Sequence, residues 1–207
     1  MLKNLLAIAG GYELFGRALG GPQGRVKFVR DYVKATSADR VMDIGCGPGM
    51  MVPFLNGATY VGFDASAEYI ESARKRYGDR GTFVCDRVSS ATLDAPGSYD
   101  IVLACGVIHH LDDDEANTLF EIAKAALKPG GRLCTFDGAY VQGQSRLARL
   151  AISRDRGQYV RRAEEYPRLA KSVFPNTRMD LRSDFLRIPY TLAVMTCVKD
   201  PSQKARQ

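Results

Sequence analysis

Residues 41–49, Val-Met-Asp-Ile-Gly-Cys-Gly-Pro-Gly, decide how the rest of the chain is interpreted. A short apolar strand ends at Ile44, and glycines follow at the alternate positions 45, 47 and 49. Glycine permits a tight turn there and leaves the backbone open to a ligand. Dinucleotide-binding loops carry Gly or Ala three residues after their second glycine, where this chain has Met50. The stretch therefore favours an adenosine-containing cofactor other than a nicotinamide dinucleotide.

Downstream of this loop, apolar runs alternate with helical patterns. We expect strands at 41–45, 59–63, 82–85, 99–105 and 132–136, and helices at 50–56, 67–77 and 115–127. Strands separated by helices pair in parallel through right-handed crossovers, so an open α/β sheet is predicted. Residues 158–173 indicate a further helix, whereas 138–157 match no clear pattern. Residues 177–186 and 190–199 read as two strands with a joint so short that they can pair only antiparallel.

The N-terminal segment precedes the first strand and is expected to be an addition to the sheet. Residues 2–19 and 24–35 look helical and are separated by Gly20-Gly21-Pro22. The first nine residues only weakly resemble a signal sequence, and we interpret them as a docking helix. If these helices lie over the ligand-bearing edge, Tyr12, Phe15 and Arg25 are candidates to cover a substrate. Ordinary packing is the alternative for each.

Size and composition favour one domain. The 207 residues are 45% hydrophobic and 25% charged, enough for one well-filled core. We divide the domain into an N-terminal helical cap (1–37), a cofactor-binding core (38–137), and an acceptor region with a terminal hairpin (138–200). No apolar run reaches the length of a membrane span, and five cysteines without a C-x-x-C pair indicate reduced thiols in the cytoplasm.

The net charge of +6 is concentrated between residues 140 and 187, which hold eleven Arg or Lys and five acids. A solvated basic face explains this asymmetry in the simplest way. An anionic substrate or a nucleic acid is the alternative.

Three aspartates follow or end neighbouring strands on the side where open parallel sheets bind ligands. Asp43 precedes the glycines, and Asp64 stands 19 residues after Gly45, a spacing at which a carboxylate accepts hydrogen bonds from ribose hydroxyls. Asp86 ends the third strand and is placed to accept from an adenine amino group. A strand-terminal Asp is often only a helix cap, but three together indicate a nucleoside site.

These residues carry a resemblance to a known family. The segments VMDIGCGPG (41–49), YVGFD (60–64), FVCD (83–86), YDIVLACGVIHHL (99–111) and LKPGGRL (127–133) are similar to the successive motifs of class I S-adenosylmethionine-dependent methyltransferases, over about residues 38–137. The likeness is to the small-molecule type (methyltransferase domains 11, 12 and 25). It implies a Rossmann-like open twisted sheet of seven strands with the last antiparallel and helices on both faces.

The resemblance also implies how the cofactor is held. It places the methionine part of S-adenosylmethionine, and of the product S-adenosylhomocysteine, over Gly45, Cys46 and Gly47, with Asp43 near the amino group. It assigns the ribose to Asp64 and places Ala65 beside the adenine. The adenine is assigned to Asp86 and the backbone of Arg87. The backbone of Cys105 and Gly106 would lie near the sulfonium. Two departures stand out: the segment after Asp86 lacks the usual Leu-Pro pair, and no Asn-Pro-Pro-Tyr follows the fourth strand, which disfavours methylation of a nucleobase nitrogen.

The chain has two histidines, His109 and His110, just past the fourth strand. Either is a candidate general base, which is needed only when the methyl acceptor is a neutral hydroxyl. A structural role at the following turn is the alternative, and a metal site with Asp112 and Asp113 is not expected because these ligands crowd along one turn. Several residues of the basic region are candidates to bind an anionic acceptor: Tyr140, Tyr159, Tyr166, Arg146, Arg149, Arg154, Arg156, Arg161 and Arg162.

The function predicted from the sequence is methyl transfer from S-adenosylmethionine to a small, anionic acceptor, most simply to oxygen. A methyltransferase acting on RNA or protein through the basic face is one alternative, although a nucleic-acid partner is disfavoured. A nucleoside-binding module without activity is another. The oligomeric state is left open between monomer and homodimer.

Overall fold

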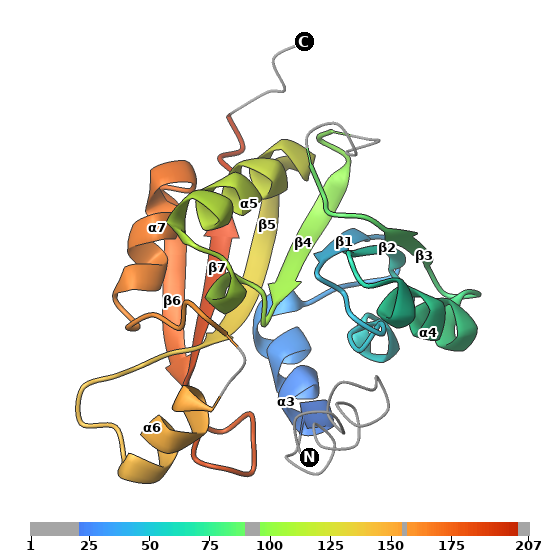
Figure 1. Cartoon of the computed structure of the whole chain (residues 1–207). Helices are drawn as coiled ribbons and strands as arrows, with labels where there is room; N and C mark the ends of the chain where they lie inside the picture. The colour runs from blue at the N-terminus through green and yellow to red at the C-terminus, as the bar shows by residue number, and fades with distance from the viewer. Residues whose placement is uncertain (1–20, 90–95, 155–156, 203–207) are drawn as a thin grey trace.

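The computed structural model describes residues 21–89, 96–154 and 157–202. Its centre is one seven-stranded sheet in the order β3-β2-β1-β4-β5-β7-β6 (Figure 1). Strands β1 to β5 pair in parallel, and β7 lies antiparallel between β5 and β6. The predicted Rossmann-like sheet with an antiparallel last strand is therefore confirmed. The strands are β1 (Arg40–Ile44), β2 (Thr59–Asp64), β3 (Thr82–Cys85), β4 (Tyr99–Cys105), β5 (Leu127–Gly138), β6 (Asn176–Arg182) and β7 (Leu192–Val198).

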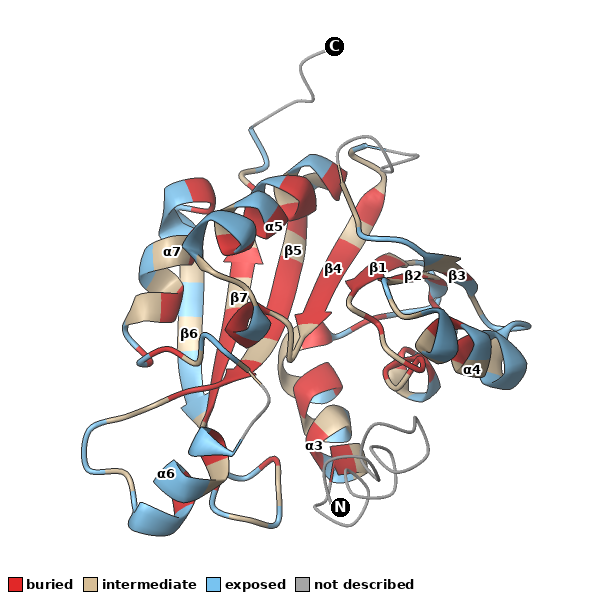
Figure 2. Ribbon diagram, viewed as in Figure 1, coloured by how far each residue is buried: buried red, intermediate tan, exposed pale blue. Residues whose placement is uncertain are grey.

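Both faces of the sheet are covered by helices, and the central strands are buried (Figure 2). Helices α5 (Asp113–Ala126) and α7 (Glu165–Val173) pack on one face. Helix α3 (Gly21–Phe28), the π-helical turn η1 (Val29–Val33) and α4 (Ala67–Tyr77) pack on the other. Side chains alternate along β1, so Val41 joins the second core and Met42 the first. No helix in the described part of the chain is both long and apolar enough to cross a membrane.

Local sequence explains where the two long crossover helices begin. The Ser66 hydroxyl accepts from the backbone N–H of Tyr69 and caps α4. Asp112 and Glu115 form a capping box, in which each side chain accepts from the other residue's backbone N–H at the start of α5. These caps fix the helices directly after the strand ends that carry the candidate site.

Four expectations for helices need correction. The helix expected at 50–56 is only a turn with a short 3₁₀ helix, η2 (Val52–Phe54), and Asn56 and Gly57 then adopt positive φ and end it. The helix expected at 158–173 begins only at Glu165, because Pro167 is tolerated only in a first turn. The stretch 138–157, which matched no clear pattern, contains a helix, α6 (Arg146–Ser153). Helix α3 begins at Gly21, so Pro22 lies in its first turn, whereas the sequence predicted that Pro22 precedes the helix. The expected helix 2–19, with Tyr12 and Phe15, lies outside the described residues.

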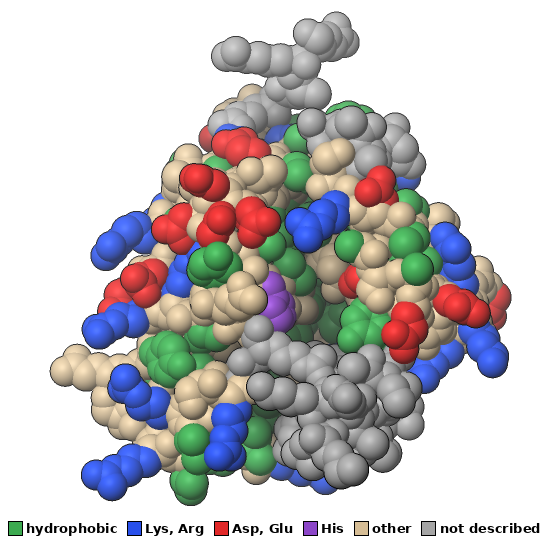
Figure 3. Space-filling view, viewed as in Figure 1, with side chains coloured by type: hydrophobic (Ala, Val, Ile, Leu, Met, Phe, Trp, Pro, Cys, Tyr) green, Lys and Arg blue, Asp and Glu red, His purple; other side chains and the backbone are tan. Residues whose placement is uncertain are grey.

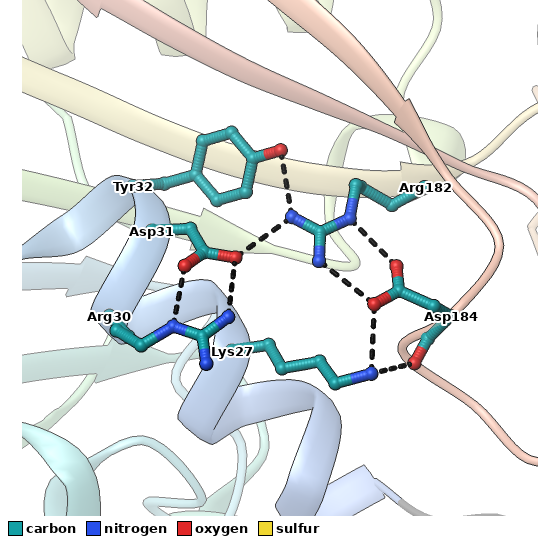
Figure 4. Close-up of polar contacts among 6 residues, drawn as sticks. All are labelled: Lys27, Arg30, Asp31, Tyr32, Arg182 and Asp184. Carbon is teal, nitrogen blue, oxygen red and sulfur yellow. Dashed lines mark hydrogen bonds and ion pairs between the residues drawn. The ribbon is translucent and has the colours of Figure 1, made fainter.

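The N-terminal helix is joined to the segment after β6 by charged and aromatic contacts (Figure 4). Arg182 on β6 donates to Asp31 and Tyr32 of η1, at 3.0 and 3.1 Å, and pairs with Asp184 at 2.7 Å. Lys27 of α3 also reaches Asp184, at 2.8 Å. Beneath these pairs, the ring of Phe28 meets Phe136 edge-on at 4.9 Å. Helix α3 is thereby fixed against the hairpin, beside the carboxyl ends of the central strands.

Candidate active site at the carboxyl ends of the central strands

The glycine loop forms an open backbone cradle between β1 and β2. The N–H groups of Gly45 and Cys46 both donate to the carbonyl of Phe63, at 2.8 and 3.0 Å. Gly45 and Gly47 have φ of +69° and +53°, a region that side chains rarely adopt. A Cβ on Gly45 would lie 2.6 Å from Val107, whereas a Cβ on Gly47 would meet nothing within 4 Å. The loop is therefore packed on the β4 side and open beside Gly47.

Asp64 lies at the end of β2 and faces this loop. Its Oδ2 accepts from the N–H of Gly47 at 2.9 Å, and its Oδ1 from the N–H of Ser66 at 2.8 Å. The carboxylate thus joins the cradle to the start of α4. Ala65, Asp86 and Arg87 are exposed, and the Asp86 carboxylate accepts from the N–H of Arg87 at 2.7 Å. The ribose and adenine roles given to these residues stay predictions.

Asp43 is buried and only half satisfied. Its Oδ2 accepts from the hydroxyl of Tyr60 at 2.7 Å, while its Oδ1 is a buried atom for which the described residues provide no hydrogen-bond partner. Burial raises the pKa of Asp43 to about 7; the Tyr60 hydrogen bond opposes this rise, the charge of Asp64 adds to it and the charge of Arg25 opposes it. An unpaired buried carboxylate oxygen is costly without a partner, so this atom is suited to a bound cation or donor.

Burial raises the thiol pKa of both cysteines of the predicted site, Cys46 and Cys105. Cys46 is buried with its Sγ against β2, where a Cβ on Gly62 would approach it to 2.8 Å. Burial raises the pKa of the Cys105 thiol well above its usual value. Both thiols therefore remain protonated, which fits the backbone contacts expected of them. Gly106 follows Cys105 with φ of +70° and donates its N–H to Phe136 at 2.8 Å.

His109 is buried and paired with an aspartate from the neighbouring strand. Its Nδ1 lies 2.8 Å from Oδ1 of Asp137, near the end of β5, and its backbone N–H donates to the same oxygen at 3.2 Å. Burial raises the pKa of Asp137, and the hydrogen bonds from His109 oppose that rise. Because Oδ1 already accepts the backbone N–H, the pair favours the imidazole tautomer with hydrogen on Nδ1, which leaves the lone pair on Nε2.

The ring of His109 lies between Gly106, which follows β4, and Gly157. Its Cε1 is the nearest atom to a Cβ on Gly106, at 3.6 Å, and a Cβ on Gly157 would overlap its Cδ2. Nε2 lies between these two carbons in the ring, so it is placed between the end of β4 and residue 157. His110 is exposed, with its ring centroid 4.2 Å from that of His109. A histidine borders a hollow in the face shown in Figure 3.

The residues expected to bind an acceptor are only partly brought together. Arg25 is half-buried, and its charge lowers the pKa values of Asp43 and Cys105, so it lies near the strand ends. Tyr140 is half-buried with the Arg149 guanidinium 5.6 Å from its ring centre. Arg146 is exposed at the start of α6. Arg161 is buried, and each of its side-chain nitrogens donates to the protein, which argues against its use as an anion ligand.

Two residues of this site were missed in the sequence. Asp137 ends a strand just as Asp64 does, and that signal was available. Tyr60 lies on the strand beside β1, two residues before the register partner of Asp43, which is Gly62. In the described parts of the chain, no group of three or more His, Cys, Asp or Glu side chains has the arrangement of a metal site.

Comparisons with known proteins agree with this geometry. Residues 42–133 match the family model described as a methyltransferase domain. The aclacinomycin 10-hydroxylase RdmB of Streptomyces purpurascens is 31% identical over 81% of this chain and 48% of its own length. The ubiquinone biosynthesis O-methyltransferase of Xanthomonas euvesicatoria pv. vesicatoria is 31% identical over 53% of this chain and 46% of its own. The chain thus spans about half the length of these curated relatives.

Solved structures share the fold. Phosphoethanolamine N-methyltransferase 2 of Haemonchus contortus, in complex with phosphomonomethylethanolamine and S-adenosylhomocysteine, has a TM-score of 0.73 at 18% identity, covering 96% of this chain and 59% of that one. The [4+2]-cyclase SpnF has a TM-score of 0.66 at 15% identity, covering 86% and 81%. With the matching domain and the seven-stranded sheet, these findings place the chain in the family of class I S-adenosylmethionine-dependent methyltransferases.

Proposed function

We propose that this chain transfers a methyl group from S-adenosylmethionine to a hydroxyl oxygen of a small, anionic acceptor. The observation that carries the proposal is the pair of buried carboxyl groups on neighbouring strands. Asp43 keeps one oxygen without a partner beside the open glycine loop, and Asp137 pairs with His109 at the end of β4 and β5. The first suits the cofactor's ammonium group, and the second suits a proton acceptor.

The residues present fit S-adenosylmethionine. The open space beside Gly47 admits a ligand against the backbone, and Asp43 offers an anionic oxygen to an amino group. Asp64 lies at the edge of the same loop for a ribose, and Ala65, Asp86 and Arg87 follow at the neighbouring strand ends for the adenine. When bound, S-adenosylmethionine supplies a methyl group activated by a cationic sulfur. Two structures of phosphoethanolamine N-methyltransferase 2 from Haemonchus contortus, which share the fold, are complexes with S-adenosylhomocysteine or S-adenosylmethionine.

The protein's own contribution is alignment and proton acceptance. Holding an acceptor oxygen in line with the methyl carbon supplies roughly 7–11 kcal/mol in favourable cases. For a neutral hydroxyl, His109 takes the proton on Nε2, and Asp137 stabilises the imidazolium through its hydrogen bond with Nδ1. In this proposal His109 is the base because Asp137 contacts its Nδ1, and the exposed His110 is a neighbour that contacts the acceptor.

The acceptor region supplies the other wall. Arg25, held by α3 near the strand ends, provides a positive charge for an acidic group, and Tyr140 with Arg149 provides a cationic aromatic surface. Arg146 on α6 lies farther out along the same segment. In this division of the chain, residues 21–37 cap the site, 38–137 hold the cofactor and 138–200 hold the acceptor. The relatives named as ubiquinone biosynthesis O-methyltransferases support a hydroxyl as the methylated group.

Two measurements test the proposal. Calorimetry should show that the protein binds S-adenosylhomocysteine and does not bind NADPH. In a turnover assay, S-adenosylhomocysteine should accumulate when the enzyme and S-adenosylmethionine are mixed with a panel of anionic phenols and hydroxy acids that includes 3,4-dihydroxybenzoate. His109→Gln should then lower turnover by about 10²–10⁴-fold with unchanged cofactor affinity. If His109→Gln and His110→Gln both retain turnover, neither histidine is the general base. Because one relative is named a hydroxylase, products are identified by mass, and a gain of oxygen instead of a methyl group would overturn the proposal.

A further inference from the structure

Arg161 is a buried cation held by the histidine turn (residues 108–111), by Asp113 at the start of α5 and by the carbonyl of Tyr159. Its side chain is 9% exposed, and its Nη2 donates to the carbonyl of Leu111 at 2.8 Å. Its Nη1 donates to the carbonyl of Ile108 at 3.0 Å. Nε and Nη2 also reach Oδ1 of Asp113, at 3.1 and 2.7 Å. The guanidinium therefore fixes the carbonyls on both sides of the His109–His110 pair.

The backbone of the same residue is tied to the strand that carries Asp137. The N–H of Arg161 donates to the hydroxyl of Tyr166 at 3.5 Å, and that hydroxyl donates to the carbonyl of Gly138 at 2.7 Å. Gly138 directly follows Asp137. One residue thus connects to both members of the His109–Asp137 pair, through its side chain to the histidine turn and through Tyr166 to the end of β5.

Two of the four residues before Arg161, Gly157 and Tyr159, contact His109 itself. The N–H of Tyr159 donates to the carbonyl of His109 at 2.9 Å. Gly157 lies against the imidazole so closely that a Cβ there would overlap Cδ2 and approach the carbonyl oxygen of His109 to 2.7 Å. The ring of His109 therefore requires glycine at this position. The acceptor segment 157–161 is built around the histidine.

We propose that Arg161 and Gly157 are positioning residues that hold His109 in the orientation and tautomer needed to accept a proton, so that the acceptor segment itself sets the base. The proposal rests on the base role proposed for His109, and it adds the residues that make that role possible. Arg161 acts by neutralising the charge of Asp113 and by fixing the carbonyls of the turn. It is itself held firmly, because displacing a buried charge from several good hydrogen-bond partners is costly. Gly157 acts by leaving space for the ring.

The chain offers a direct readout because it has only two histidines. Protein with ¹⁵N-labelled imidazole in a His110→Gln background carries one labelled ring, whose two nitrogen shifts report the tautomer of His109 without any acceptor. The parent should show the Nδ1–H form. Arg161→Met and Gly157→Ala should each change the ratio of the two tautomers by at least about threefold, or broaden both signals, while Arg161→Lys has an intermediate effect. Arg162→Met, which alters an exposed neighbouring arginine, is the matched control and should match the parent.

The outcomes separate the two proposals. Unchanged imidazole spectra in Arg161→Met and Gly157→Ala would overturn the positioning role, whatever the turnover. If Arg161→Met unfolds, Arg161→Lys and Gly157→Ala decide the question in the same spectrum. If Arg161→Met and Gly157→Ala alter the tautomer ratio but His109→Gln retains full turnover, the positioning role stands and His109 is not the general base. If both proposals hold, Gly157→Ala lowers kcat at least about tenfold, with S-adenosylhomocysteine affinity unchanged, and has no further effect in a His109→Gln background.

Discussion

Removing the Tyr60 hydroxyl should weaken cofactor binding in a manner that depends on pH. That hydroxyl donates to Asp43 at 2.7 Å, both residues are buried, and the pKa of Asp43 is already raised to about 7. If the ammonium group of the ligand binds only the ionised carboxylate, the affinity for S-adenosylhomocysteine should fall about tenfold between pH 8 and pH 6 in the unmodified protein.

Tyr60→Phe deletes a hydrogen bond to a charged group, worth about 1.5–3 kcal/mol, and so raises the pKa of Asp43 by about one to two units. The ionised fraction at pH 7 then drops from about one half to between one-tenth and one-hundredth, which weakens binding by about 5- to 50-fold. The deficit should shrink as the pH rises toward 8.5, because the carboxyl group ionises again. A general packing defect would not recover in this way.

The assay is calorimetric titration of S-adenosylhomocysteine between pH 6 and 8.5. Tyr77→Phe, which removes a tyrosine hydroxyl at the end of α4, is the control and should behave as the unmodified protein does. An affinity that does not vary with pH in the unmodified protein, or a Tyr60→Phe deficit that stays constant to pH 8.5, would refute the reasoning. Stability has the opposite sign: because the pKa of Asp43 is raised on folding, its contribution to the free energy of unfolding declines as the pH rises from about 4 to 7.

Three further outcomes are expected. Asp64→Ala should weaken S-adenosylhomocysteine by about 10- to 100-fold in the same calorimeter, because two charged hydrogen bonds are lost, and an unchanged affinity would remove the ribose assignment. Arg182→Met should lower the free energy of unfolding in urea at pH 7 by about 1–2 kcal/mol relative to Arg178→Met on the same strand, since Arg182 joins Asp31, Asp184 and Tyr32. Asp31 has its pKa lowered to about 2 by Arg30 and Arg182, and the pKa of Asp184 is lowered by Arg182 and Lys27, so this stabilisation should be lost as the pH falls from about 4 through 2. A labelled single-stranded RNA should not bind at 50 mM salt, where an RNA methyltransferase would bind strongly and lose affinity by 200 mM.

The strands and the glycine loop could be predicted because their signals are local. Each of β1, β2, β3 and β4 is a short, mostly apolar run with Asp or Gly at its last position or directly after it, and the parallel order follows from the connections between them. The caps at Ser66 and Asp112 are equally local. By contrast, the start of α7 depends on Pro167, because proline is tolerated only in the first turn of a helix. The spacing of apolar residues does not indicate that limit.

The pairs that complete the site depend on register between strands, which sequence spacing does not give. His109 meets Asp137 because Cys105 on β4 lies beside Phe136 on β5. Tyr60 meets Asp43 because side chains two residues apart share one face of the sheet. Arg161 was counted among the basic residues available to an anion, but burial and five donated hydrogen bonds commit it to the fold. Charge counts overstate a binding surface when some cations are internal.

The arrangement separates the grip on the cofactor from the choice of reaction. The glycine loop, Asp43 and Asp64 belong to β1 and β2, whereas Gly157, Tyr159 and Arg161 belong to a segment that follows the parallel strands. His109 lies between the end of β4 and this segment. One fold can carry different reactions when the residues around the reacting groups differ. Changes in residues 157–161 should therefore alter turnover or product while leaving S-adenosylhomocysteine affinity within about twofold, since independent sites are additive.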